Sequence, residues 1–335
     1  MKSARHVPLK IPLPPWLQDH RFGETAVLPA VEIMALLARA AAREYPGAAI
    51  GHIRGARFHR FLKIPPRAGH MAATAVLTPS AGGGLLAALE TRFRSPNSTM
   101  RRTLRHAELH FDAGGTVSAP DFEAAASPGE NGALLEAERV YPELVDFGPA
   151  FRNLRGRLQL DRQGVLAQVA GSPRGMPVAG AGEVSPLGAV FALDAALHAA
   201  CVWGQVFRGV VAFPTAIESR EVPAPTAAGE TYLAKVSAQA ANDGDLCFDI
   251  WIYDRAGRLR EAALGVHMRD LGHGRRRPPS WTAALAADGV PPPQPPPATT
   301  RSATERSLRH ETLRFLDTGG DNGTGGGRGR PGCRR

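Results

Sequence analysis

Two segments of this 335-residue chain carry residue types that could move protons, and they lie far apart in the sequence. His20 begins the run His20–Pro29, and Asp194 lies four residues before His198, a spacing that puts both side chains on one helix face. A β-elimination needs a base that takes a proton and an acid that gives one, on the two sides of a carbon-carbon bond. We therefore expect His20 to be the base and Asp194 the acid, with His198 holding the carboxyl through a hydrogen bond.

The surroundings of Asp194 and His198 are apolar, because their neighbours are alanine, leucine, phenylalanine, cysteine and tryptophan. A carboxyl on such a helix is rarely buried without a reason, so an ordinary exposed ion pair is the less favoured interpretation. Burial favours the uncharged forms, which gives a carboxyl that can donate a proton and an imidazole that can accept one. The sequence thus predicts that both His20 and Asp194 are desolvated.

Two apolar helices must position these groups. Apolar residues recur at helical spacing from Pro29 to about Arg43 and from Pro186 to about Trp203, and each run begins with a proline. Both runs are apolar nearly all round, which is typical of helices at the centre of a fold. His20 precedes the first predicted helix, and Asp194 lies within the second.

Strand-like segments follow each helix in the same order, with an offset of about 158 residues, which indicates an internal duplication. An antiparallel sheet wrapped round a central helix, occurring twice, is the pattern of an α+β double hotdog fold. Two unrelated α+β domains with chance similarity are the alternative. The first set of segments is Met71–Thr78, Leu85–Phe93 and Arg105–Phe111, and the second set is Thr231–Ser237, Leu246–Tyr253 and Glu261–Met268.

Three ordered motifs resemble those of polyketide synthase dehydratase domains. His20–Pro29 resembles their His-x-x-x-Gly-x-x-x-x-Pro motif, although the glycine is one position early at Gly23 and Glu24 occupies the expected site. Asp194–His198 resembles their Asp-x-x-x-His or Asp-x-x-x-Gln segment, without the His-Pro that precedes the aspartate in relatives. Each motif is modest alone, and their order along the chain makes the resemblance specific.

The middle motif, Phe147–Phe151, resembles the family's Tyr-Gly-Pro-x-Phe segment with phenylalanine in place of the tyrosine. In relatives that tyrosine hydroxyl can bond the substrate's β-hydroxyl or the acidic group. Its loss keeps a rival of the same fold open, an enzyme that moves a double bond or guides cyclisation. A noncatalytic domain that binds a carrier protein is the rival from another class.

The resemblance covers about residues 12–271. It implies an enzyme, a hydro-lyase that removes water from 3-hydroxyacyl thioesters in polyketide or fatty-acid-like biosynthesis. The implied organisation is an N-terminal hotdog over residues 1–120, a linker over 121–136 and a C-terminal hotdog over 137–271. The substrate would arrive on the phosphopantetheine arm of an acyl carrier protein, among other synthase components and with no further cofactor. A homodimer stays open, because two hotdogs in one chain already form the unit that single hotdogs make by pairing.

Substrate contacts are expected where the two halves meet. The amino end of the first helix, at Ala30 and Val31, offers unpaired backbone N–H groups to a developing enolate oxygen. The acyl chain would lie in a tunnel lined by apolar and aromatic residues. The residues expected to bind the substrate are Gly23, Pro29, Phe147, Gly148, Pro149 and Phe151.

Positive charge is concentrated at the C-terminal end of the chain. The net charge is +9, and residues 272–335 hold eleven arginines against five acidic residues. Their runs of proline, glycine and arginine predict a disordered basic tail, in which the segment from Ser302 has the start of a short helix. Because the rest of the chain is only mildly basic, nucleic-acid binding is disfavoured.

The remaining composition favours a cytoplasmic protein. No apolar stretch approaches the roughly 18 residues of a membrane span, and prolines interrupt the amino-terminal segment before an apolar run of signal length. Cys201, Cys247 and Cys333 have neither the spacing of metal ligands nor the even number of a disulfide framework, so we expect no metal site.

Overall fold

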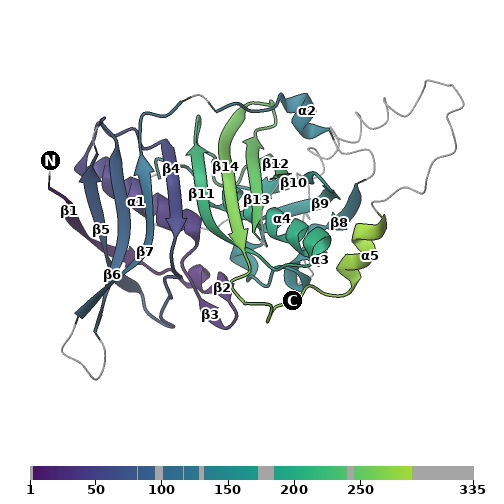
Figure 1. Cartoon of the computed structure of the whole chain (residues 1–335), viewed down its shortest axis with the longest axis horizontal. Coiled ribbons are helices and arrows are strands. Elements are labelled where there is room, and N and C mark those ends of the chain that lie inside the picture. Colours follow the sequence, from purple (N-terminus) through teal and green to yellow (C-terminus); the bar gives the residue numbers. More distant parts are fainter. Residues whose placement is uncertain are drawn as a thin grey trace, which may run out of the picture.

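A single curved antiparallel sheet is the main feature of the molecule (Figure 1). The computed structural model describes residues 3–80, 82–94, 101–115, 117–127, 132–172, 185–239 and 245–288. Within these described residues, twelve strands form the sheet, and two further short strands, β2 (Arg21–Phe22) and β3 (Thr25–Ala26), form a separate hairpin. The twelve strands are β1 (Arg5–Pro12), β4 (His52–Phe58), β5 (His70–Pro79), β6 (Leu85–Arg94), β7 (Arg101–Phe111), β8 (Ala133–Glu136), β9 (Leu154–Asp161), β10 (Gly164–Ala170), β11 (Phe213–Glu221), β12 (Thr231–Gln239), β13 (Leu246–Tyr253) and β14 (Leu259–Arg269).

Two long helices supply the core that the sheet encloses. The first, α1 (Ala30–Glu44), packs on β5 and β6, and the second, α4 (Phe191–Arg208), packs on β10, β12 and β13. Both helices are mostly buried, as their apolar sequences predict. The smaller elements are the helices α2 (Phe122–Ala126), α3 (Ala137–Glu143) and α5 (Trp281–Asp288), and the 3₁₀ turns η1 (Pro15–Asp19) and η2 (Pro149–Phe151).

The strand order repeats in mirror fashion about the middle of the sheet. From the centre outward, the first half runs β4, β7, β6, β5, β1, and the second half runs β11, β14, β13, β12, β10, followed by β9 and β8. The halves meet where β4 pairs with β11, with Ile53 opposite Arg220. This symmetry supports the predicted duplication, and the two predicted sheets are joined edge to edge into one.

The first central helix agrees with its predicted bounds, but the second begins later than predicted. Gly188 has a φ of +72°, a conformation that favours glycine, and the backbone there forms a turn instead of a helix. The Ala189 N–H donates to the Thr226 carbonyl at 2.9 Å, which ties this turn to a neighbouring loop. The helix therefore starts at Phe191 and ends before Gly209, whose φ is +65°.

Two predicted boundaries are wrong. The predicted linker over 121–136 contains α2, and its end belongs to the sheet, because β8 pairs with β9. The predicted tail starts too early at residue 272, because the chain continues into α5, which packs on α4 and β8. Residues 289–335, including the segment from Ser302, lie outside the described residues.

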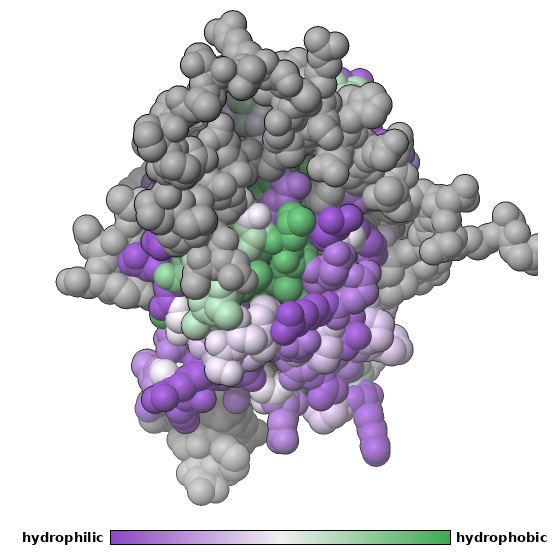
Figure 2. All heavy atoms as spheres, turned by 90° about the vertical axis from the view of Figure 1, so that its right-hand side faces the viewer, coloured by the Kyte–Doolittle hydropathy of each residue, from purple (hydrophilic) through white to green (hydrophobic). Residues whose placement is uncertain are grey.

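Hydrophobic side chains gather on the end of the molecule that carries α3, β8 and α5. Figure 2 shows them there, bordered by hydrophilic ones. Leu134 of β8 is a large hydrophobic residue with half of its surface exposed on this last strand. The Arg139 guanidinium lies 3.8 Å from the centre of the Trp281 ring, so α3 and α5 contact each other at this end of the molecule.

Among the residues that the structure describes, none of the helices has the length and hydropathy that crossing a membrane requires.

A buried ion pair connects the first helix to the second half. The Arg220 Nε atom donates to the Glu261 carboxylate at 2.6 Å, and neither side chain is exposed. The same guanidinium lies 3.8 Å from the Met34 sulfur on α1. The ion pair thus links β11 to β14, and the Met34 contact links both to α1 at the junction of the halves. Removing one partner would leave an uncompensated buried charge.

Candidate active site

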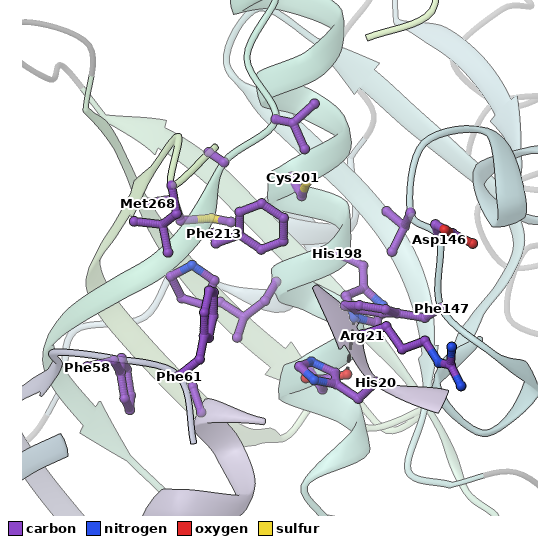
Figure 3. A pocket seen from close by; sticks show the side chains of 18 of the residues that line it. His20, Arg21, Phe58, Phe61, Asp146, Phe147, His198, Cys201, Phe213 and Met268 are labelled. Carbon is purple, nitrogen blue, oxygen red and sulfur yellow. Dashed lines mark ion pairs between the residues drawn. The ribbon is translucent and has the colours of Figure 1, made fainter. Parts of the chain in front are cut away.

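A cavity of about 350 Å³ lies where the two halves meet (Figure 3). Both halves line it, so it exists only in the assembled fold. Its volume is at the lower end of the range of small-molecule sites in proteins. The lining includes His20, Ala30, Phe58 and Phe61 from the first half, and Phe147, Asp194, His198, Cys201, Phe213 and Met268 from the second.

His20 is held at the end of η1 by its own backbone and ring. The Val27 N–H donates to the His20 carbonyl at 2.9 Å, across the hairpin that Gly23 turns with a φ of +63°. The His20 Nδ1 atom lies 2.9 Å from the Val27 carbonyl, which can only accept, so Nδ1 carries the proton. The Nε2 atom of the neutral ring is therefore left with a free lone pair.

Aromatic rings desolvate this imidazole. The centre of the His20 ring lies 4.4 Å from the Phe147 ring and 5.0 Å from the Phe151 ring. Burial lowers the pKa of His20 below its ordinary value of 6.5, although the Asp194 charge and the Val27 hydrogen bond oppose the shift. The ring is thus neutral near pH 7, which is the form that accepts a proton.

Asp194 and His198 face each other on α4, one helical turn apart. Their side chains are both 6% exposed, and the His198 Nε2 atom lies 3.1 Å from Asp194 Oδ2. The predicted hydrogen bond between them is not formed, because the N–H direction is not aligned with the oxygen, and both atoms lack a partner among the described residues. The pair has the distance of an ion pair and needs a rotation to become hydrogen-bonded.

Phe147 lies between the two imidazoles. Its ring centre is 4.4 Å from that of His20 and 4.9 Å from that of His198. In Figure 3 the Phe147 ring and both histidines are grouped on one side of the cavity. The residue that replaces the motif tyrosine therefore separates the two histidines without offering a hydroxyl.

A tyrosine that the sequence reasoning missed lies behind His198. The Tyr141 hydroxyl is 2.9 Å from His198 Nδ1, and it accepts the Leu154 N–H at 3.3 Å. Burial raises the pKa of Tyr141 above its ordinary value of 10, so the hydroxyl keeps its proton. The signal for this residue was a tyrosine six positions before Phe147, since a buried tyrosine hydroxyl usually needs a partner.

Asp19 joins the histidine segment to the segment of Phe147. The Asp19 carboxylate accepts the Ala150 N–H at 3.0 Å, and the backbone carbonyl of Asp19 accepts the Gly148 N–H at 2.9 Å. A Cβ atom on Gly148 would lie 2.3 Å from Asp19 Cγ, closer than atoms can approach. Gly148 is therefore required by this close approach and not by its backbone angles.

Several residues predicted to contact the substrate do not line the cavity. Val31 is fully buried in the core, whereas Ala30, one residue earlier, does line the cavity. Phe151 is also fully buried, because it packs beneath His20, Trp16 and Phe191. The other residues placed outside the lining are Gly23 in the hairpin turn, Pro29 before α1, and Gly148 and Pro149 at η2; of the six, only Phe147 lines the cavity.

Glu32 is a second buried carboxyl that the sequence reasoning missed. It lies in the first turn of α1, and only 8% of its surface is exposed. Burial raises the pKa of Glu32 to about 7, partly opposed by the Arg39 charge and reinforced by that of Asp194. Glu32 does not line the cavity, so we expect its charge to affect the stability of the fold and not the reaction.

Within the described ranges, we find no group of three or more histidine, cysteine or acidic residues placed to hold a metal ion.

Two family models match the chain, one in each half. A family model described as polyketide synthase dehydratase domain matches residues 8–90, and one described as polyketide synthase dehydratase N-terminal domain matches residues 119–278. The first match contains His20, and the second contains Asp194 and His198. No curated protein sequence matches the chain.

Solved structures share the fold. A trans-AT polyketide synthase dehydratase domain from Brevibacillus brevis matches with a TM-score of 0.63 and 17% identity, over 81% of this chain and 95% of that one. The dehydratase domain of PpsC from Mycobacterium tuberculosis, in complex with C12:1-CoA, matches with 0.61 and 18%, over 80% and 94%. A bifunctional dehydratase-cyclase domain from ambruticin biosynthesis matches with 0.58 and 20%, over 79% and 91%. These likenesses confirm the double hotdog fold.

Proposed function

Because the chain belongs to the polyketide synthase dehydratase family, we propose that it removes water from a 3-hydroxyacyl thioester to give an enoyl thioester. One observation carries the proposal: His20 and Asp194, from different halves, line the same apolar cavity. The His20 ring has its free lone pair on Nε2, and the carboxyl is buried. A base and an acid on one cavity are the two groups that a β-elimination requires.

In the proposed reaction, His20 Nε2 takes the proton from the α-carbon of the thioester. The electron pair of that C–H bond forms the double bond to the β-carbon, and the C–O bond at the β-carbon breaks. Asp194 gives its proton to the departing hydroxyl, which leaves as water. Burial favours the neutral form of His20, which is the form that accepts a proton in the first step.

The thioester oxygen gains negative charge as the α-proton leaves. Ala30 is the first residue of α1 and lines the cavity, and the first N–H groups of a helix have no acceptor within it. We propose that the Ala30 amide stabilises this oxygen, aided by the helix dipole. Val31, which the sequence also favoured, does not line the cavity and is not placed to share this role.

The substrate is proposed to enter on the phosphopantetheine arm of an acyl carrier protein. The C12:1-CoA bound by the PpsC domain is an acyl thioester of related chemistry. Arg21, Arg60 and Arg276 belong to the cavity lining, and each of them is at least partly exposed. Positive charge there would attract an acidic carrier protein and orient its arm. The proposed reaction is acid-base chemistry by side chains and uses no further cofactor.

A second candidate function follows from Phe147. Without the motif tyrosine, the β-hydroxyl of a substrate meets one donor fewer, and the same base and acid could move a double bond or assist ring closure. The similar dehydratase-cyclase domain from ambruticin biosynthesis combines dehydration and ring closure in one domain, which supports the cyclase alternative. The intact Asp194 in the cavity favours dehydration, because loss of hydroxide needs an acid.

Mass spectrometry, which detects the loss or gain of water, together with proton NMR, which detects double-bond migration and ring closure, tests the proposal on three thioester substrates. We expect a 3-hydroxyacyl thioester to lose one water and the corresponding enoyl thioester to regain it. Migration of the double bond without reversible hydration would select the isomerase. Ring closure of a substrate with a distal hydroxyl would add the cyclase activity. Binding of carrier protein with no change in any substrate would make the domain noncatalytic.

A further inference from the structure

The hydroxyl of Tyr141 has a defined hydrogen-bond direction. It accepts the Leu154 N–H at 3.3 Å and lies 2.9 Å from His198 Nδ1. The described residues offer its proton no other acceptor, so the O–H donates to Nδ1. Both side chains are buried, and no water competes for this contact easily.

The direction of this hydrogen bond determines which ring nitrogen of His198 carries the proton. If Nδ1 of His198 accepts, the neutral ring must carry its single proton on Nε2. That N–H is on the side of Asp194, with Oδ2 at 3.1 Å. Among the described residues, both atoms are buried without a hydrogen-bond partner, so rotation of the carboxyl into alignment costs neither atom an existing bond.

We propose that Tyr141 is a positioning residue that keeps the His198 proton on Nε2, so that Asp194 presents its own acidic proton on Oδ1. A carboxyl whose Oδ2 faces an N–H donor cannot carry its proton on that oxygen without a clash of two hydrogens. The proton is therefore held on Oδ1, the oxygen left to face the substrate in the cavity that Asp194 lines. This last step rests on the proposed function, whereas the state of His198 does not.

The position of Tyr141 separates this role from that of the motif tyrosine. Tyr141 does not line the cavity and reaches the site only through His198. It therefore does not replace the hydroxyl missing at Phe147, whose ring lies against His198 on another side. The Tyr141 hydroxyl thus orients Asp194 through the His198 imidazole, from a position outside the cavity lining.

The first test measures directly which nitrogen of the His198 ring carries the proton. Nitrogen NMR of the folded protein distinguishes a histidine protonated on Nε2 from one protonated on Nδ1. We expect wild-type His198 to carry its proton on Nε2, and Tyr141→Phe, which keeps the ring and removes the hydroxyl, to shift it toward Nδ1. Tyr253→Phe is the matched control, because it removes another buried hydroxyl, which bonds the Pro120 carbonyl at 2.7 Å. An Nδ1 proton in the wild type, or no change in Tyr141→Phe, would overturn the proposal.

The second test is kinetic and includes a variant that bypasses the tyrosine. We expect Tyr141→Phe to lower kcat roughly tenfold with little change in KM, the effect of losing one oriented hydrogen bond. In a His198→Gln background the amide N–H can face Asp194 without help, so adding Tyr141→Phe should have little further effect. An equal loss in both backgrounds would mean that Tyr141 acts only through packing. If the wild type turns over no thioester, the proposed function fails, while the NMR comparison still decides the role of Tyr141.

Discussion

The Asp19 carboxylate accepts the Ala150 N–H at 3.0 Å, and this contact joins the residue before the proposed base to the segment that carries Phe147. The two residues come from different halves of the duplicated fold. The position of His20 against Phe147 is thus set by a hydrogen bond between the halves and not by the histidine segment alone.

Gly148→Ala should disturb that contact. Its Cβ atom would lie 2.3 Å from Asp19 Cγ, so one segment must move. Overpacking of this kind costs about 1–3 kcal/mol, and we expect urea unfolding to show a loss in that range. Gly47→Ala is the control, because its Cβ would meet nothing within 4 Å. Equal stability of Gly148→Ala and the wild type would show that Asp19 does not constrain the loop.

The pH dependence of turnover should reflect the shifted pKa of His20. A base works while its lone pair is free, which is above its pKa, so activity falls as the pH drops through that value. Because burial lowers the pKa of His20 below 6.5, the acid limb of kcat/KM should have its midpoint below 6.5. The measurement is a pH profile with a 3-hydroxyacyl thioester. A midpoint at or above 6.5 would argue against a desolvated base.

Phe147→Ala should move that midpoint upward. The Phe147 ring lies 4.4 Å from the His20 ring, and its removal admits water, which favours the charged imidazole. The pKa of His20 should then rise toward 6.5, and the acid limb with it. Phe61→Ala enlarges the same cavity, although Phe61 stacks on Phe22 and Phe213 instead of His20, and should leave the limb in place. A shift of equal size in both variants would assign it to cavity volume.

Glu32→Gln should stabilise the protein at high pH only. The pKa of Glu32 is raised to about 7 from an ordinary value of 4.5, so its contribution to stability is complete below pH 4.5 and is lost as the pH rises through about 7. Glutamine stays neutral, and we expect a gain of about 2–3 kcal/mol above pH 7 and none near pH 4.5. Urea unfolding at both pH values measures it, with the exposed Glu24→Gln as control. A gain that is the same at both pH values would contradict a buried, titrating Glu32.

The sequence predicted the two central helices and the duplication, because periodicity and short motifs are local. Contacts between segments that are distant in the chain could not be predicted, because no local pattern encodes them. Tyr141 reaches His198 only because α3 and α4 pack together through β9, and Gly148 meets Asp19 only across the two halves. The late start of α4 depends on a turn that a loop near Thr226 stabilises.

The predicted substrate contacts show the same limit. The motif residues are expected to touch the substrate, but Gly23, Gly148 and Phe151 instead support the positions of His20 and Phe147, and Pro29 and Pro149 lie outside the cavity lining. The aromatic lining formed by Phe58, Phe61 and Phe213 belongs to no motif. It arises from the ends of strands that the fold brings together, which no local pattern reveals.

The proposed function requires His20 and Asp194 to act in one reaction step. Its most direct test is turnover of a 3-hydroxyacyl thioester by the wild type, His20→Ala, Asp194→Asn and the double variant, with unfolding curves to verify that each is folded. We predict that each single change lowers kcat by roughly 100- to 10,000-fold, and that the double change adds little, because residues acting as a unit are not additive. Near-wild-type turnover in either folded single variant would contradict the account.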